Sequence, residues 1–331
     1  MITAGWTLAL LLLSVVSATA GEREVSFQNG TVELKGTILT PATGGRHPAV
    51  VFLHGSGPAT RDGARAYAEE FAKLGLVSLF FDKRGCGASG GSWTQSSLED
   101  LANDALAATA LLAQQPDVDP ARIGLWGVSQ AGWVATVAAS KSKDVAFLVL
   151  ITGGGATPRE VERYGYERAF ANAGLGDADK AEAFAVIDRY FNYLATGQGR
   201  ADVAARLEKS QTAAWYPYAR LDRILPSEEN RANWSWVATW DPAASMAKIT
   251  CPTLLMFGSK DEQVPTDVAV KKWREGLQKA GNKDVTLVVF PDASHGLRLG
   301  EHRPDGRAPF ADGYAELMLG WLWYHVVKPA R

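Results

Sequence analysis

The chain has 331 residues, of which 47% are hydrophobic and 21% are charged, and its formal net charge is −2. This length suits one large α/β domain or two smaller ones, and the apolar content is enough for a sizeable core. Acidic and basic residues are interspersed, so the sequence offers no basic stripe for nucleic acid and no polybasic patch for a membrane surface. We therefore expect a globular protein that binds neither.

The first twenty residues have the pattern of a secretory signal peptide. Leu8 to Val16 form an apolar run that is too short to span a bilayer, and Ala18-Thr19-Ala20 supplies a small-x-small cleavage site. We expect export to the periplasm or the medium, cleavage after Ala20 and no stable membrane insertion afterwards. The segment before the apolar run lacks Lys and Arg, so an uncleaved N-terminal anchor is the alternative.

From residue 21 onward, strand-like and helix-like segments alternate. Residues 24–41 read as two strands that turn at Asn29-Gly30, a strong hairpin signal. Short apolar runs then predict six further strands, at 48–55, 76–85, 121–128, 145–154, 251–258 and 285–292. Helical patterns lie near 64–74, 98–114, 132–142, 267–280 and 309–326. The alternation predicts an α/β fold, with a mostly parallel sheet of about eight strands between helices and the hairpin at one edge.

Residues 157–248 break this alternation, because they have helical spacing but no convincing strand. A structureless loop of that length is improbable in a compact domain. We expect a helical insertion, or cap, over the carboxyl ends of the strands, which divides the core domain into residues 21–156 and 249–331. Six aromatic residues of the insertion either line a pocket or pack it against the core: Trp215, Tyr216, Tyr218, Trp234, Trp236 and Trp240. No acidic cluster of the insertion clearly marks a site for an amino terminus, although Glu228 and Glu229 leave such a site open.

The chain has two cysteines, Cys86 and Cys251. Cys86 follows a predicted strand and Cys251 precedes one, so a parallel sheet places them at opposite ends, about 20 Å apart. That separation is far beyond the reach of a disulfide. We predict two free thiols.

The segment GVSQAGW, residues 127–133, places Ser129 between a predicted strand and a predicted helix. A serine on such a tight turn exposes its hydroxyl, and the turn requires small residues two positions before and after, here Gly127 and Ala131. The helix that follows directs its N-terminal N–H groups toward any oxyanion formed there. The alternative is an ordinary connection in which Ser129 caps the helix.

A serine nucleophile needs a general base, usually a histidine that a carboxylate orients. His295 follows the last predicted strand, and with His54 it is one of two histidines at the correct edge of the sheet; His47, His302 and His325 lie elsewhere. Asp261, just after the strand at 251–258, is the favoured carboxylate. Glu262 and Asp292 are its rivals, and Asp292 is so close to His295 that a role in shaping the turn is favoured for it.

Several motifs together resemble the α/β-hydrolase superfamily, in particular its esterase-like and exported serine-peptidase-like members. GVSQAG resembles the nucleophile elbow G-x-S-x-G, with Ala131 in place of the second glycine. HGSGP at 54–58 resembles the oxyanion loop, and DKRGCGASGG at 82–91 resembles the loop after the next strand. The order Ser129, Asp261, His295 also agrees. The resemblance covers the chain from about residue 32 to its end, except for the insertion, which corresponds to the variable cap.

This resemblance implies further roles. The backbone N–H groups of Gln130 and Ser56 are expected to form the oxyanion hole. His54 is expected to be a structural member of its loop. Arg84 is expected to hold the 82–91 loop by hydrogen bonds beneath the oxyanion turn, without a catalytic role.

The resulting hypothesis is a carboxylic ester hydrolase that uses Ser129, His295 and Asp261 through an acyl-enzyme intermediate. Its expected substrate is a small ester or a short peptide. The histidines and cysteines lack paired spacing for a metal, and no dinucleotide fingerprint is present, so we expect neither metal nor cofactor. A peptidase, amidase or thioesterase with the same triad is the alternative, and a non-catalytic binding protein is a more distant one. The sequence leaves the oligomeric state open.

Overall fold

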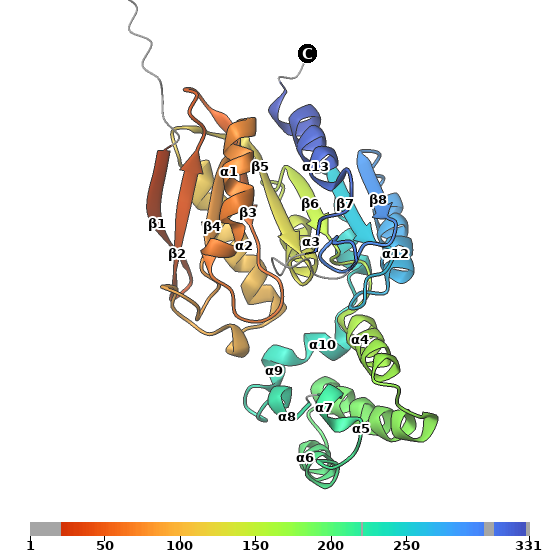
Figure 1. Ribbon diagram of the computed structural model, residues 1–331. Coiled ribbons are helices and arrows are strands. Elements are labelled where there is room, and N and C mark those ends of the chain that lie inside the picture. The colour runs from red at the N-terminus through yellow and green to blue at the C-terminus, as the bar shows by residue number, and fades with distance from the viewer. Residues whose placement is uncertain (1–20, 220, 301–307, 329–331) are drawn as a thin grey trace, which may run out of the picture.

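The computed structural model describes residues 21–219, 221–300 and 308–328, so the predicted signal peptide and His302 lie outside it. Its centre is an eight-stranded sheet in the order β1-β2-β4-β3-β5-β6-β7-β8 (Figure 1). The strands are β1 Gly21–Asn29, β2 Val32–Thr40, β3 His47–Phe52, β4 Val77–Phe81, β5 Val118–Val128, β6 Phe147–Ile151, β7 Thr253–Gly258 and β8 Val285–Phe290. The predicted sheet is confirmed: β1 and β2 pair antiparallel at one edge, and β3 to β8 are parallel.

Helices cover both faces of this sheet (Figure 1). Their bounds are α1 Arg65–Leu74, α2 Leu98–Ala113, α3 Ala131–Lys141, α12 Thr266–Lys279 and α13 Tyr314–Leu322, which continues as a π-helical turn over Trp323–Val327. The short 3₁₀ turns η1 Arg61–Ala64 and η2 Trp93–Gln95 precede α1 and α2. The last helix begins five residues later than the pattern predicts, because Phe310 instead forms a bridge with Arg298 and Gly313 starts the helix with a positive φ.

The two faces of the sheet carry separate hydrophobic cores. One core joins the sheet to α2, α3 and α12 through side chains such as Leu112, Val134 and Trp273. The other joins it to α1 and α13 through Phe71 and Trp321. Every residue of β3 after His47, and every residue of β4, β6 and β7, is buried. A strand that is covered on both faces has a continuous apolar sequence, and for this reason these strands could be predicted from the sequence.

Helices α4 to α11 lie between β6 and β7 and are called here the helical insertion. Their bounds are α4 Pro158–Asn172, α5 Asp177–Thr196, α6 Arg200–Lys209, α7 Tyr216–Ala219, α8 Leu221–Ile224, α9 Arg231–Trp234, α10 Trp236–Thr239 and α11 Ala243–Met246. Most of them lie together beyond one end of the sheet (Figure 1) and share a core of their own around Phe170, Phe191 and Trp215. No helix in the described parts of the chain is both long and apolar enough to cross a bilayer.

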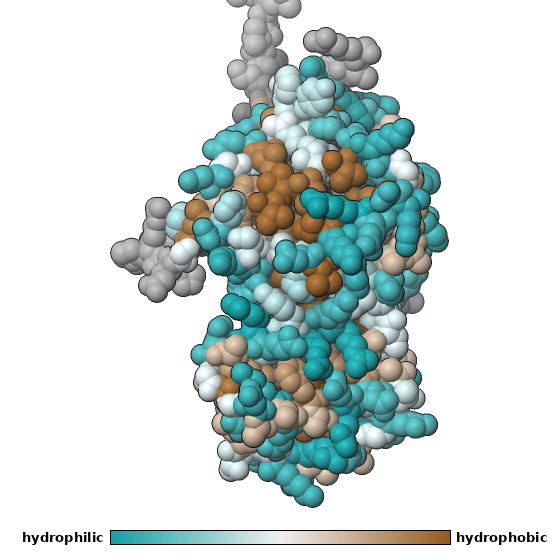
Figure 2. Space-filling view, turned by 90° about the vertical axis from the view of Figure 1, so that its right-hand side faces the viewer, coloured by the Kyte–Doolittle hydropathy of each residue, from teal (hydrophilic) through white to brown (hydrophobic). Residues whose placement is uncertain are grey.

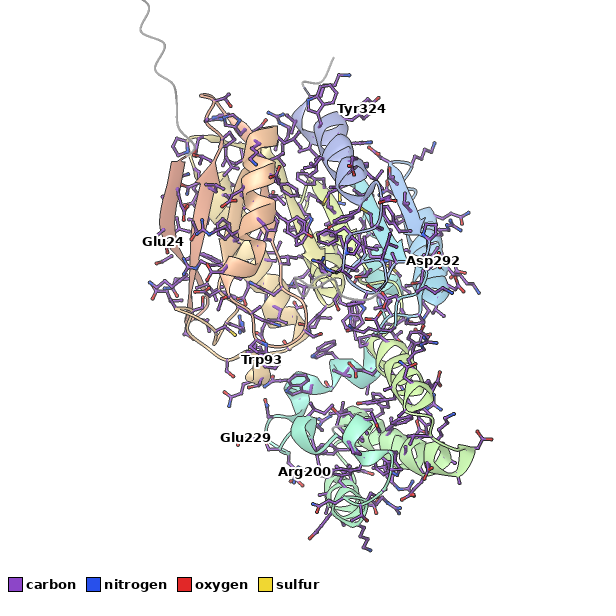
Figure 3. All side chains as sticks on the ribbon, viewed as in Figure 1. Glu24, Trp93, Arg200, Glu229, Asp292 and Tyr324 are labelled. Atoms are coloured by element: carbon purple, nitrogen blue, oxygen red, sulfur yellow. The ribbon has the colours of Figure 1, made fainter. Side chains whose placement is uncertain are left out.

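The insertion contacts the core domain through aromatic pairs and hydrogen bonds. Trp236 packs edge-on against Trp133 of α3, with ring centroids 5.9 Å apart. Trp234 packs against Trp93 at 6.3 Å, and its indole N–H donates to the carbonyl of Thr94 over 2.7 Å. Figure 3 shows Trp93 on the core side, facing the insertion. The aromatic residues of the insertion therefore serve largely in packing.

The edge of the sheet that carries β8 is incompletely covered. Figure 2 views the molecule from this side and shows hydrophobic residues gathered over its upper half. Residues 285–288 of β8 are partly exposed, and Val289 is 36% exposed. This strand is accordingly less buried than β6 and β7 beside it.

Cys86 and Cys251 are both unpaired thiols in the structure, as predicted. Cys86 follows β4 and Cys251 precedes β7, and burial raises the pKa of the Cys251 thiol to about 11.

Protein unfolded in guanidinium without reductant should therefore react with a chromogenic disulfide reagent at two thiols per chain. Detection of no thiol would contradict the strand directions that separate the two residues.

Candidate active site

Ser129 lies on the turn between β5 and α3, with its backbone in the left-handed region at φ 61°. Non-glycine residues rarely adopt this conformation, and it costs about 1–2 kcal/mol. The turn is also cramped, because a Cβ atom added at Gly127 would collide with the Cβ of Ala131. Small residues at both positions are therefore a steric requirement, and Ala131 meets it as well as a glycine would.

The loop that follows β6 supports this turn from the other side. A Cβ atom at Gly153 would collide with the carbonyl oxygen of Ser129, and one at Gly132 would collide with the backbone of Gly153 and Gly154. The N–H of Ser129 donates to the carbonyl of Ile151 over 3.0 Å. The run of three glycines at 153–155 is thus part of the site, a role that the sequence interpretation did not give it.

Asp261 and His295 are directly paired beyond the ends of β7 and β8. His295 Nδ1 lies 2.9 Å from Oδ2 and 3.1 Å from Oδ1 of Asp261. The carboxylate is buried, and its Oδ1 also accepts the N–H groups of Gln263 and Val264, each over 2.8 Å. An ionised carboxylate can only accept, so the proton resides on Nδ1 and leaves Nε2 with a free lone pair.

The rival residues have other contacts. Glu262 accepts the backbone N–H of His295 over 3.2 Å, and Asp292 occupies a turn position at φ 54°. His54 donates from Nε2 to the carbonyl of Phe81 over 2.6 Å, and burial lowers its pKa to about 4, so its ring is neutral and structural. His47 and His325 contact Thr43 and Asp284.

The HGSGP loop at 54–58 lies against the Ser129 turn. A Cβ atom at Gly55 would be 3.5 Å from the carbonyl oxygen of Val128 and 3.8 Å from Cβ of Ser129. Among the hydrogen bonds of the described residues, the backbone N–H groups of Ser56 and Gln130 have no protein acceptor. Both donors are consequently available to a ligand.

Lys83 holds the two predicted oxyanion donors together, and the sequence interpretation missed it. Its ammonium donates to the carbonyls of Gly55 and Gly57 over 2.8 and 3.0 Å and to Oε1 of Gln130 over 3.1 Å. Carbonyls on both sides of Ser56 thus face Lys83. Burial lowers the pKa of Lys83 to about 8. The only sequence signal was a lysine two residues after a buried strand.

Arg84 holds the 82–91 loop by hydrogen bonds, as expected, but its partners do not lie beneath the oxyanion turn. Its guanidinium pairs with Asp104 of α2 over 2.6 and 2.7 Å and donates to Oγ of Ser96 over 2.9 Å. It therefore fixes the 82–91 loop to α2, while Lys83 makes the contacts beneath the oxyanion turn.

A cavity of about 280 Å³ joins Ser129 and Ser56 to the helical insertion. Trp133, Gly153, Gly154, Gln263 and Val264 line it from the core domain, and Val161, Glu162, Gly165, Tyr166 and Tyr218 line it from the insertion. Within the described residues the Ser129 hydroxyl makes no hydrogen bond to His295. The structure therefore pairs His295 with Asp261 and places Ser129 in the wall of a cavity that also contains Gln263 and Val264, the neighbours of Asp261.

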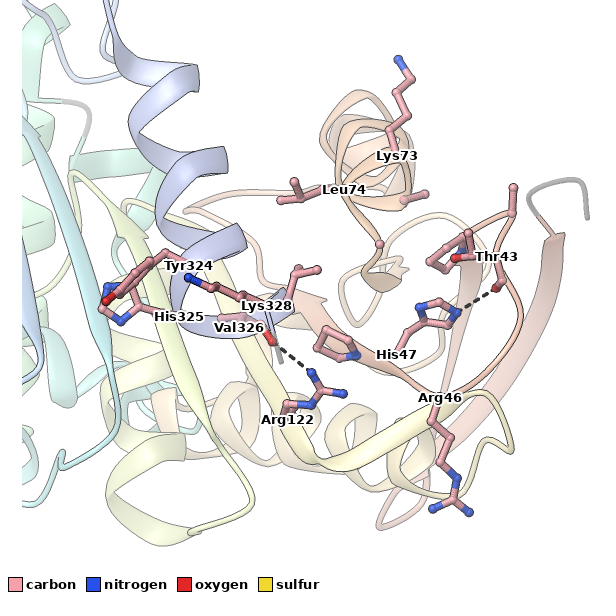
Figure 4. Close-up of a pocket in the computed structure, with 16 residues that line it drawn as sticks. Thr43, Arg46, His47, Lys73, Leu74, Arg122, Tyr324, His325, Val326 and Lys328 are labelled. Atoms are coloured by element: carbon pink, nitrogen blue, oxygen red, sulfur yellow. Dashed lines mark hydrogen bonds between the residues drawn. The ribbon is translucent and has the colours of Figure 1, made fainter. Parts of the chain in front are cut away.

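A larger cavity of about 1340 Å³ lies at the amino ends of the strands, away from these residues (Figure 4). Its lining includes His47, Arg122 and His325, and Arg122 donates to the carbonyl of Val326 over 3.2 Å. None of the predicted site residues lines it. Ligands of parallel sheets bind at the opposite edge, beyond the carboxyl ends of the strands. In the described parts of the chain, no three His, Cys, Asp or Glu side chains are grouped as a metal site requires.

The chain belongs to the alpha/beta hydrolase family, whose model matches residues 50–309. Esterase EstD of Thermotoga maritima is 26% identical over 275 residues, which cover 81% of this chain and 59% of that protein. The thiohydrolase aneE of Aspergillus aculeatus is 36% identical over 121 residues, which cover 36% of this chain and 37% of that protein. This chain thus matches about 37% to 59% of the length of these curated relatives.

Solved structures agree on the fold. The Pyrococcus furiosus esterase Pf2001 superposes with a TM-score of 0.59 at 17% identity, over 98% of each chain. The Pyrococcus horikoshii acylaminoacyl peptidase gives a TM-score of 0.60 at 16% identity, over 95% of this chain and 43% of that one. Identities this low speak for the fold alone, and they confirm the α/β-hydrolase architecture.

The contacts of Lys83 predict a dependence of the site on pH. Below a pKa of about 8 the ammonium makes all three hydrogen bonds, and above it the neutral amine has one donor fewer. The contribution of Lys83 to the rate at which a fluorophosphonate labels Ser129 should therefore decrease as the pH rises through that value. Lys83→Met should label about 10- to 1,000-fold more slowly, since one misplaced oxyanion donor has an effect of that size.

The measurement is the labelling rate between pH 6 and pH 10, with Lys73→Met as the control, because Lys73 is an exposed residue paired with Glu70. Labelling of Lys83→Met at the wild-type rate would contradict the inference that Lys83 supports the oxyanion donors.

Proposed function

We propose that this protein is a serine hydrolase that cleaves carboxylic esters through an acyl-enzyme intermediate. The observation that carries the proposal is the left-handed Ser129 on its cramped turn, in the wall of a cavity that is also lined by Gln263 and Val264, whose N–H groups donate to the carboxylate paired with His295. A serine in this backbone conformation lowers the stability of an ordinary connection, and strained residues of this kind are frequent at functional sites.

In the first half-reaction, Ser129 Oγ attacks the ester carbonyl carbon while its proton passes to His295 Nε2. A new C–O bond forms, and the negative charge on the former carbonyl oxygen is held by the N–H groups of Gln130 and Ser56. Collapse of the tetrahedral intermediate breaks the bond to the alcohol, which leaves with the proton from His295. Asp261 stabilises the imidazolium in between.

In the second half-reaction, water replaces the alcohol. His295 Nε2 takes a proton from the water as its oxygen attacks the acyl-enzyme, and the same two N–H groups hold the new oxyanion. Collapse returns the proton to Ser129 and releases the carboxylic acid. Since both steps use the same groups, the proposed reaction needs no further cofactor.

The proposal predicts that Ser129→Ala lowers ester turnover by several orders of magnitude, on the order of 10⁶-fold, because the attacking oxygen is lost. The measurement is hydrolysis of a series of p-nitrophenyl esters, together with fluorophosphonate labelling. Ser140→Ala is the control, since its hydroxyl only donates to the carbonyl of Val137 in α3. Circular dichroism should show that both variants are folded.

Wild-type turnover that survives in Ser129→Ala would contradict the assigned nucleophile. The same protein tested on aminoacyl anilides and on thioesters separates the amidase and thioesterase alternatives, because each shares the triad and differs only in the leaving group. A wild-type protein that resists fluorophosphonate and cleaves none of these substrates would be a binding protein.

A further inference from the structure

A carboxylate that the proposed mechanism does not use lines the same cavity as Ser129. It belongs to Glu162 on α4, and Val161, Gly165 and Tyr166 of that helix line the cavity with it. Residues three and four apart share one face of a helix, so this face of α4 is turned toward the proposed nucleophile. Glu162 is therefore placed to contact a bound substrate.

No cation of the described residues neutralises Glu162, which has neither a hydrogen bond nor an ion pair there. The basic residues near it on α4 are engaged elsewhere: Arg163 contacts Asp188 over 3.1 Å and the Phe184 ring, and Arg159 contacts the Phe191 ring. Lys272 pairs with Glu160. Burial raises the pKa of the Glu162 carboxyl.

The tyrosines near Glu162 do not supply a positive charge to balance its carboxylate. Burial, with a smaller contribution from the charge of Glu162, raises the pKa of both Tyr166 and Tyr190, so these phenols are neutral at neutral pH. Glu162 is half-buried. A carboxylate that is partly removed from water without a partner is destabilising, and a ligand that brings a positive charge relieves this cost. Trp133, Tyr166 and Tyr218 add aromatic surface to the same cavity, which suits an ammonium and an apolar side chain alike.

We propose that Glu162 binds a protonated amine on the acyl part of the substrate, so that the site selects aminoacyl esters over otherwise identical neutral esters. The preference for an ester rests on the proposed function, whereas the amine contact rests on the cavity alone. Glu228 and Glu229, the acids that the sequence offered for this role, are both exposed and do not line the cavity.

The test compares leucine methyl ester with methyl 4-methylpentanoate, which has the same carbon skeleton without the amine. Hydrolysis of both is followed in a pH-stat at neutral pH for the wild type and Glu162→Gln. The ratio of kcat/KM for the amine ester to that for the neutral ester should fall by about 10- to 100-fold in Glu162→Gln, the range of a hydrogen bond to a charged group. The neutral ester should change by less than about threefold.

The matched control is Glu167→Gln, an exposed carboxylate on the same helix that pairs with Arg163. It should keep the wild-type ratio. A wild-type protein without preference for the amine ester, or a Glu162→Gln protein that keeps the preference, would overturn the proposal.

A binding measurement separates this proposal from the proposed reaction. Ser129→Ala and Ser129→Ala/Glu162→Gln are titrated by calorimetry with leucinamide and with 4-methylpentanamide. Tighter binding of leucinamide that disappears with Glu162→Gln supports the amine site even if neither ester is hydrolysed. Equal binding of the two amides to Ser129→Ala overturns the amine site even if both esters are hydrolysed in a Ser129-dependent way.

Discussion

The steric crowding at Ser129 is the constraint on which the rest of the site depends. A left-handed residue between a buried strand and a buried helix fits because Gly153 leaves room for the carbonyl of Ser129, and because Gly127 and Gly132 let the following helix and the loop after β6 pack closely around the turn. The strain of about 1–2 kcal/mol is small beside the burial of β5 and α3, which fixes both ends of the turn. The fold therefore holds the hydroxyl out of the sheet, and it leaves the next N–H, that of Gln130, unused by the helix.

The segment after β4 distributes three charged residues to three tasks. Asp82 accepts the backbone and the guanidinium of Arg61, which ties down the chain that follows the HGSGP loop. Lys83 turns toward the carbonyls of that loop, and Arg84 turns toward Asp104 of α2. Preorganised donors stabilise an oxyanion without reorganising, so a rigid loop matters more than any single bond within it.

Much of this molecule could be predicted from its sequence because its signals are local. Period, turn residues and continuous apolar runs placed the strands. The residue types at strand ends led to Ser129, Asp261 and His295; the structure pairs the last two, and the catalytic roles stay a prediction. Lys83 and Glu162 could not be found that way. Their importance comes from their surroundings in the folded protein. Lys83 faces two backbone carbonyls, and the carboxylate of Glu162 lines a cavity without a cationic partner among the described residues. The late start of α13 likewise depends on the bridge between Phe310 and Arg298, a tertiary contact.

Helix α4 connects the sheet to the rest of the helical insertion. It starts just after the glycines at 153–155, with a capping box between Thr157 and Glu160. Tyr164 then donates to the backbone carbonyl of Asp261 over 2.9 Å, and Lys272 of α12 binds Glu160. Helix α4, which carries Glu162, is thus hydrogen-bonded to the backbone of Asp261. A substrate amine bound by Glu162, as proposed, would consequently be positioned relative to the sheet itself.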